Sequence, residues 1–223
     1  ETIGMFRMLS DAVDGPIEHF DDRYWGLDLL ERVAGGDAMS PLRYLLAFSA
    51  YAVAQVADHT PAWRAPYQKA FEGYVERMLL PEAWQDWLTE WGGTTPLGPD
   101  NIMYTGHLAL MFSLHRQVFG QVRYESSVQF GLSDGSAVFE TDLHSLTEWL
   151  AEQAANDTDN NGEHTLHVAC EPGRIFVPCN TPHRISQLVY DGMFGTNYAA
   201  SNAEWARWVE ARMLEPESGV LYD

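Results

Sequence analysis

Apolar residues recur every three or four positions along most of this sequence, and each run ends at glycine, proline or polar residues. The clearest run lies between Ser40-Pro41 and Thr60-Pro61, and one of its faces is formed by Leu42, Leu45, Leu46, Val53 and Val56. This spacing is typical of an amphipathic α-helix. The same pattern predicts helices over residues 1–10, 16–33, 62–80, 101–119, 141–155, 182–193 and 202–213, and a short one after Pro81. The chain is therefore expected to be all-α.

The stretch from about residue 121 to 140 departs from this pattern. Val122, Tyr124, Val128 and Phe130 alternate with polar residues there, and the turn Ser133-Asp134-Gly135 precedes Ala137-Val-Phe139. This pattern predicts a small β-hairpin inserted between helices. Elsewhere helices alternate with short loops. That order favours paired helices, arranged either as a bundle or as a helical toroid.

Length and charge limit the possible functions. With 223 residues the chain can bury one sizeable core, so a single domain is expected. Its 32 acidic and 13 basic residues give a net charge of −19. Such a surface repels phosphate groups and anionic lipids, which argues against binding nucleic acids or membrane surfaces and favours an uncharged substrate.

The sequence also bears on localisation. No apolar run has the length of a transmembrane helix, and the first residues do not form a signal peptide. We therefore expect a cytoplasmic protein. A periplasmic location is the alternative, since the sequence does not begin with Met and a signal peptide could have been removed.

The chain has only two cysteines, Cys170 and Cys179, and they stand at either end of a loop interrupted by Pro172, Gly173 and Pro178. Thiolates are strong nucleophiles, and loops on a rigid scaffold often carry chemistry. The residues that follow, 180–182, read as a helix N-cap with proline in the first turn. Cys179 is therefore expected just before a helix N-terminus, where the macrodipole favours an anion. From the residues alone, a buried pair or a local disulfide is equally acceptable.

A metal site is not expected. The two cysteines are farther apart than the pairs of most structural zinc sites. Residues 157–162 match the first half of a calcium-binding loop, but its twelfth position, which requires a bidentate glutamate, is Val168. His107 lies on an apolar helix four residues after Met103, where a histidine is more often part of the core than a ligand.

Two motifs together resemble those of the linalool dehydratase/isomerase family. They are Cys-Glu-Pro followed by Phe176 and Cys179-Asn180, and the run Asn-Ile-Met-Tyr-Thr-Gly-His over residues 101–107. Shorter matches are Arg43-Tyr44, Arg123-Tyr124, Val189-Tyr190-Asp191 and Gly195-Thr196. The resemblance extends from about residue 16 to the end of the sequence. It implies cofactor-independent dehydration or isomerisation of tertiary and primary allylic alcohols, such as linalool or 2-methyl-3-buten-2-ol.

The resemblance also implies an (α/α)6-barrel-like toroid. Six helix pairs need more chain than this, so residues 1–223 are expected to form about the first half of the barrel, with the insertion at 121–140. A second chain, identical or different, is then expected to complete the barrel in an oligomer.

The family assigns roles to particular side chains. The resemblance implies that Cys170, Cys179 and His107 act on protons or capture the substrate covalently. By the same resemblance, the substrate hydroxyl is held by Glu18 and Tyr24, although the family has aspartate where this chain has Glu18. The pocket residues expected from it are Tyr44, Met103 and Phe176. No metal or cofactor is expected.

Two other functions remain open. A glycosidase-like (α/α) barrel would need paired carboxylates across an aromatic cleft, and it would leave the cysteine motif unexplained. A non-catalytic half-barrel that supports a catalytic partner is the alternative without enzymatic activity.

Overall fold

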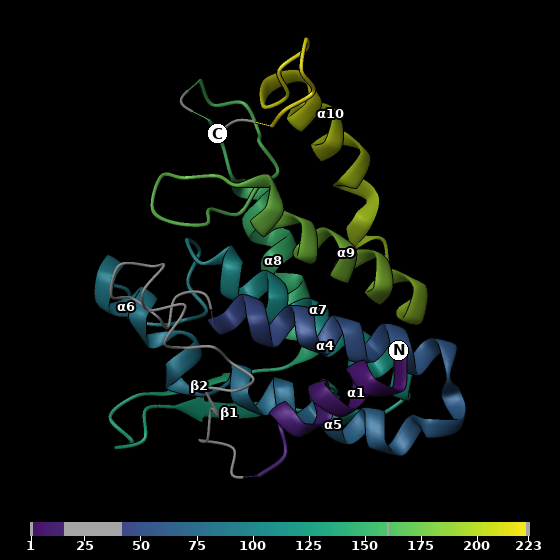
Figure 1. The fold of residues 1–223 in the computed structure, drawn as a ribbon. Coiled ribbons are helices and arrows are strands. Elements are labelled where there is room, and N and C mark those ends of the chain that lie inside the picture. The colour runs from purple at the N-terminus through teal and green to yellow at the C-terminus, as the bar shows by residue number, and fades with distance from the viewer. Residues whose placement is uncertain (1, 16–41, 160, 222–223) are drawn as a thin grey trace. The chain divides into compact units, whose positions relative to one another are not determined.

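The computed structural model describes residues 2–15, 42–159 and 161–221 (Figure 1). Eight α-helices, four short 3-10 helices and one two-stranded sheet account for the regular structure of these residues, which confirms the predicted all-α class with a small hairpin. The chain divides into two compact units. Unit 1 comprises Glu1–Pro96 and Leu114–Asp142, and unit 2 comprises Leu97–Ser113 and Leu143–Asp223. The toroid and the assignment of a single partial-barrel domain stay predictions.

Unit 1 is built on helices α1 (Thr2–Ala12), α4 (Leu42–His59) and α5 (Arg64–Met78), which pack on one another (Figure 1). A 3-10 turn, η1 (Pro61–Trp63), joins α4 to α5. The fully buried side chains at the centre of this unit are Leu42, Leu46, Val53, Phe71, Tyr74, Val75 and Met78. The helical spacing seen in the sequence therefore marks the core of unit 1.

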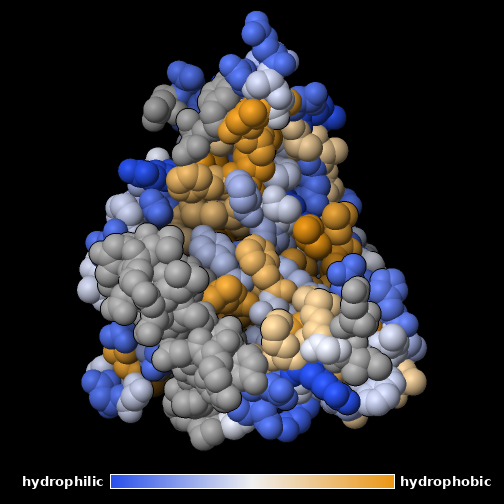
Figure 2. Space-filling model, viewed as in Figure 1, coloured by the Kyte–Doolittle hydropathy of each residue, from blue (hydrophilic) through white to orange (hydrophobic). Residues whose placement is uncertain are grey.

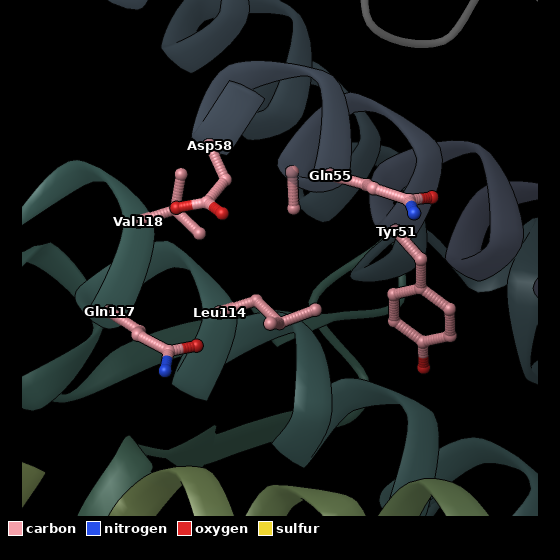
Figure 3. A pocket seen from close by; sticks show the side chains of 7 residues that line it. Tyr51, Gln55, Asp58, Leu114, Gln117 and Val118 are labelled. Atoms are coloured by element: carbon pink, nitrogen blue, oxygen red, sulfur yellow. The ribbon is translucent and has the colours of Figure 1, made fainter. Parts of the chain in front are cut away.

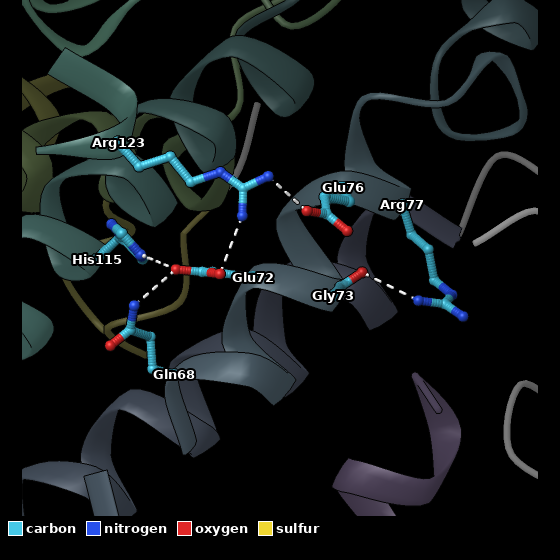
Figure 4. A network of polar contacts seen from close by, with 7 residues as sticks. All are labelled: Gln68, Glu72, Gly73, Glu76, Arg77, His115 and Arg123. Atoms are coloured by element: carbon cyan, nitrogen blue, oxygen red, sulfur yellow. Dashed lines mark hydrogen bonds and ion pairs between the residues drawn. The ribbon is translucent and has the colours of Figure 1, made fainter. Parts of the chain in front are cut away.

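A carboxylate ties three segments of unit 1 together. Glu72 on α5 accepts hydrogen bonds from Gln68 and Arg123, and it pairs with the ring of His115 at 2.9 Å (Figure 4). Burial alone would raise the pKa of Glu72, but these hydrogen bonds and the charges of His115 and Arg123 lower it. The pKa of His115 is also lowered, chiefly by burial. The network thus joins α5 to the second half of α7 and to η3 (Arg123–Glu125).

The predicted hairpin is present as β1 (Val128–Gly131) and β2 (Val138–Thr141), which pair antiparallel with Phe130 opposite Phe139. Both rings pack edge-on against Trp84, with centroid distances of 6.1 and 5.5 Å. Trp84 lies between η2 (Pro81–Ala83) and α6 (Gln85–Trp91). Aromatic packing therefore fixes the hairpin to the α5–α6 region of unit 1.

Unit 2 contains the first half of α7 (Ile102–Phe119), together with α8 (Leu143–Asn156), α9 (Val177–Phe194), η4 (Tyr198–Ser201) and α10 (Asn202–Arg212). Every residue from 101 to 113 is buried. A helix that is apolar on all sides is typically an interior helix. This part of α7 is therefore the centre of unit 2.

The predicted start of α9 is wrong. The helix begins at Val177 rather than near Pro182, with Phe176 in extended conformation as its N-cap. Pro178 at the second helical position costs nothing, because that N–H has no helical partner. Pro182 is accommodated inside the helix, at the loss of one backbone hydrogen bond. Cys179 consequently lies within the first turn of α9 and not before it.

The carboxylate of Asp159 closes the polar turn that follows it. Asp159 accepts hydrogen bonds from the backbone N–H groups of Asn161 and Glu163 at 2.8 and 3.0 Å. Within the part of the chain that the structure describes, no three His, Cys, Asp or Glu side chains cluster so as to hold a metal ion. Nor does any helix there have the length and apolarity needed to cross a bilayer.

Candidate active site

Unit 2 brings the two cysteines into contact. The Sγ atoms of Cys170 and Cys179 are 2.8 Å apart, and both residues are free thiols with exposures of 2% and 8%. A disulfide bond measures about 2.05 Å. The two sulfurs are therefore close enough to share or exchange a proton while both remain reduced.

A tight turn folds the chain so that the thiols meet. Pro172 and Gly173 occupy the middle of a β-turn in which the N–H of Arg174 donates to the carbonyl of Glu171 at 2.9 Å. Gly173 has φ 74°, a conformation required at the third position of a type II turn and accessible to glycine. The N–H of Cys170 then donates to the carbonyl of Arg174 at 2.9 Å. The Pro-Gly pair seen in the sequence thus forms the turn that reverses the chain direction.

Asn180 holds the two sides of this loop together. Its side-chain amide accepts from the N–H of Val168 at 2.9 Å and donates to the carbonyl of the same residue at 3.0 Å. It also donates to the carbonyl of Phe176 at 3.2 Å. Asn180 is fully buried, so these bonds are shielded from water. The residue predicted to cap a helix instead fixes the segment before Cys170 to the first turn of α9.

Helix α7 approaches the backbone of α9 closely at Gly106. A methyl group at Gly106 would lie 3.4 Å from the carbonyl oxygen of Cys179 and 3.4 Å from Cβ of His183. The N–H of Ile102 donates to the carbonyl of Ala169 at 3.0 Å, which ties the start of α7 to the segment before Cys170. His107, the next residue after Gly106, is 2% exposed.

The first turn of α9 gives the two thiols different surroundings. Cys179 is the third residue of this helix, whereas Cys170 precedes the turn. Backbone N–H groups at a helix N-terminus carry partial positive charge, which favours a nearby thiolate. The position of α9 therefore favours negative charge at Cys179 over Cys170.

His183 was not among the predicted site residues. It lies one turn after Cys179 on α9 and is fully buried, and among the described residues neither of its ring nitrogens has a hydrogen-bond partner. Burial holds its pKa well below 6.5, and the charge of Arg184 acts in the same direction. The four-residue spacing from Cys179 was the signal in the sequence that could have identified it.

His167 is a second buried histidine of unit 2, and it is fully hydrogen-bonded. Its Nδ1 lies 2.9 Å from the carbonyl of Thr165, and its Nε2 lies 3.1 Å from the indole nitrogen of Trp205. Because the indole N–H can only donate, Nε2 is the acceptor and the ring is neutral. Burial lowers the pKa of His167 to about 4. Its role is structural, since it joins α10 to the segment that leads to Cys170.

The described residues among the remaining predictions come from three separate segments. Met103 is buried on α7, three residues before Gly106, and Phe176 is half-buried directly before α9. Tyr44 belongs to unit 1, where its ring stacks on Phe48 with a centroid distance of 6.2 Å. Glu18 and Tyr24 lie outside the described residues.

Unit 1 has a pocket of its own, of about 340 Å³ (Figure 3). Helices α4 and α7 line it with Tyr51, Ala54, Gln55, Asp58, Leu114, Gln117 and Val118. None of these was predicted as a site residue. Burial raises the pKa of Tyr51 well above 10, so its phenol stays neutral. The lining offers hydrogen bonds but contains no nucleophile paired with a base.

The fold and the thiol site define an all-α protein with a buried, reduced cysteine pair in unit 2. The family model for linalool dehydratase/isomerase matches residues 43–223. The chain belongs to the linalool dehydratase/isomerase family. The match confirms the resemblance drawn from the cysteine loop and from the motif at residues 101–107.

Proposed function

We propose that this protein dehydrates, and isomerises, a small neutral allylic alcohol such as linalool or 2-methyl-3-buten-2-ol. Family membership supports an enzyme of the dehydratase/isomerase type. The observation that carries the proposal is the 2.8 Å separation of two buried thiols, because it supplies an acid and a base at one place.

Dehydration needs both groups. The hydroxyl must gain a proton before the C–O bond breaks, and a neighbouring carbon must lose a proton to form the new double bond. A pair of sulfurs that holds one proton provides both functions, since the thiol donates while the thiolate accepts. After one turnover the proton resides on the opposite sulfur. Transfer across the 2.8 Å contact restores the starting state without any cofactor.

A covalent route uses the same atoms. The thiolate attacks an allylic carbon as the protonated hydroxyl leaves as water, and a C–S bond forms as the C–O bond breaks. Loss of a proton from the neighbouring carbon then breaks the C–S bond and releases the diene. Because α9 favours negative charge at Cys179, we assign that sulfur as base or nucleophile and Cys170 as the acid.

The other family positions complete the proposal. His107, buried on α7 beside Gly106, would exchange protons with the thiols. Glu18 and Tyr24 would hold the substrate hydroxyl. The hydrocarbon would contact Tyr44, Met103 and Phe176. The high negative charge of the chain, −19, is compatible with a neutral substrate.

Headspace gas chromatography tests the activity. The protein, alone and with any co-encoded partner, is incubated anaerobically with either alcohol, and the diene is quantified. We expect Cys170→Ala and Cys179→Ala each to lower the rate by ~10²-fold or more. Ile175→Val, which removes one methyl group from the same loop, should leave the rate nearly unchanged. Full turnover by the Cys170→Ala variant would remove the central role of the pair.

We also propose that the protein functions as an oligomer in which a second chain completes the barrel. Apolar side chains gather over α9 in the space-filling view (Figure 2), and Ile185 and Leu188 there are 42% and 58% exposed. Exposed apolar patches of this kind often mark interfaces. Analytical ultracentrifugation checks this proposal, and a stable, active monomer would contradict it.

A further inference from the structure

One face of α9 carries a stripe of buried polar side chains that begins at the thiol pair. Cys179, His183 and Gln187 follow one another at four-residue intervals and are 8%, 0% and 1% exposed. Residues at this spacing lie one above the other on a helix. Helical side chains also lean towards the N-terminus, which directs the ring of His183 towards the turn that holds Cys179.

The stripe contains hydrogen-bonding atoms that no described side chain or backbone group satisfies. Neither ring nitrogen of His183 has a partner, and the amide nitrogen of Gln187 has none. The amide oxygen of Gln187 accepts from Arg184 at 3.3 Å. A neutral imidazole offers one donor and one acceptor, and an amide nitrogen offers two donors. Burying such groups unpaired is unfavourable, and native proteins nearly always satisfy them with protein or with ordered water.

The position of His183 connects this unsatisfied group to the active site. Its Cβ and the carbonyl oxygen of Cys179 are both 3.4 Å from the point where a side chain at Gly106 would begin. The imidazole and the thiol therefore originate at the same crossing of α9 and α7. A buried water requires two to four polar partners, and His183 and Gln187 together supply enough of them.

We propose that His183 and Gln187 form a binding site for a single hydroxyl-sized group, occupied by a water molecule, beside the Cys170–Cys179 pair. Its role rests on the proposed function. Dehydration breaks the C–O bond and releases the protonated hydroxyl as water. Isomerisation forms a new C–O bond between water and the other end of the allylic cation, with loss of one proton to the thiolate. A water held at His183 serves both steps, because the site keeps the oxygen that leaves the substrate for addition at the other end of the allylic cation.

The existence of the site is tested without any substrate. If a water is bound, His183→Leu removes the imidazole that binds it and lowers the urea midpoint of unfolding. His183→Gln keeps a donor and an acceptor for the water, so its midpoint should stay close to that of the wild type. His167→Leu is the matched control, since both nitrogens of that buried ring are bonded and its midpoint must fall. A His183→Leu midpoint at or above that of the wild type would overturn the site. Should the variant not fold, NMR of wild-type protein labelled with ¹⁵N-histidine tests whether the water site exists. Absence of any magnetisation transfer from water to the His183 ring would overturn the site.

The role in catalysis is tested by running the isomerisation in ¹⁸O-water. We expect the wild type to retain the substrate oxygen in the alcohol product. We expect His183→Leu to incorporate at least several-fold more ¹⁸O, and these two results together would support a held water. His167→Gln controls for general loss of stability and should retain the oxygen as the wild type does. Equal incorporation by wild type and His183→Leu would overturn this role. If no alcohol is converted at all, the proposed function fails, while the unfolding and NMR measurements still decide whether the site exists.

Discussion

Replacing Asn180 with alanine removes the amide that joins the first turn of α9 to the segment before Cys170. Val168 is 2% exposed, and both its N–H and its carbonyl would lose the hydrogen bond that the Asn180 amide makes to them. The carbonyl of Phe176 would lose the bond from the Asn180 side chain but would still accept the hydrogen bond from the backbone N–H of residue 180, which is 3.3 Å long. A buried group left unpaired costs ~1–3 kcal/mol, so we expect the free energy of unfolding to fall by about 3–4 kcal/mol.

Two measurements follow the Asn180→Ala change. Urea unfolding monitored by tryptophan fluorescence gives the change in stability. The rate at which a mild oxidant closes the Cys170–Cys179 disulfide reports whether the sulfurs still meet, and we expect it to fall by ~10-fold or more as their alignment is lost. Asn180→Asp keeps one acceptor for the N–H of Val168 but loses both donated bonds, so it should also be strongly destabilised.

Asn197→Ala is the control, because that asparagine is exposed and such substitutions usually change stability by less than about 0.5 kcal/mol. A loss below ~1 kcal/mol for Asn180→Ala, with an unchanged rate of disulfide closure, would refute the role assigned to this amide.

Three further predictions concern single contacts. The pKa of His167 is about 4 in the folded protein and ~6.5 in the unfolded chain, so between these pH values only the unfolded chain binds a proton at this residue. The free energy of unfolding should therefore decrease by roughly 3 kcal/mol as the pH falls from ~6.5 to about 4. Urea midpoints of His167→Gln should depend less on pH than those of the wild type. The buried Nη2 of Arg43 lies 2.7 and 2.6 Å from the carboxylate oxygens of Asp86, so Asp86→Asn should cost about 3 kcal/mol in thermal unfolding, and a loss near zero would contradict a buried ion pair. Gly106→Val should push α7 away from the carbonyl of Cys179, lower the free energy of unfolding by about 2 kcal/mol and slow disulfide closure. Closure of the Gly106→Val disulfide at the wild-type rate would contradict a close approach of the two helices at this point.

Much of the helical structure could be predicted because it depends on local spacing. The stripes at residues 42–59 and 101–119 became α4 and α7, and the hairpin followed from its alternating residues and the turn at Gly135. The error at the start of α9 also has a local cause. Proline is acceptable both at the second helical position and, at some cost, inside a helix, so Pro178 and Pro182 offered two possible starts.

The sequence by itself determined the helical class, the Pro-Gly turn and, through two motifs, the family. Only the tertiary structure decided that the sulfurs lie 2.8 Å apart, that Asn180 bonds Val168 rather than capping a helix, and that the buried ring of His183 has no hydrogen-bond partner among the described residues. The physical reason is that periodicity and turn chemistry act between neighbours in the chain. Burial and hydrogen-bond satisfaction are set where α7, α9 and the cysteine loop meet, and those contacts join residues that are distant in sequence.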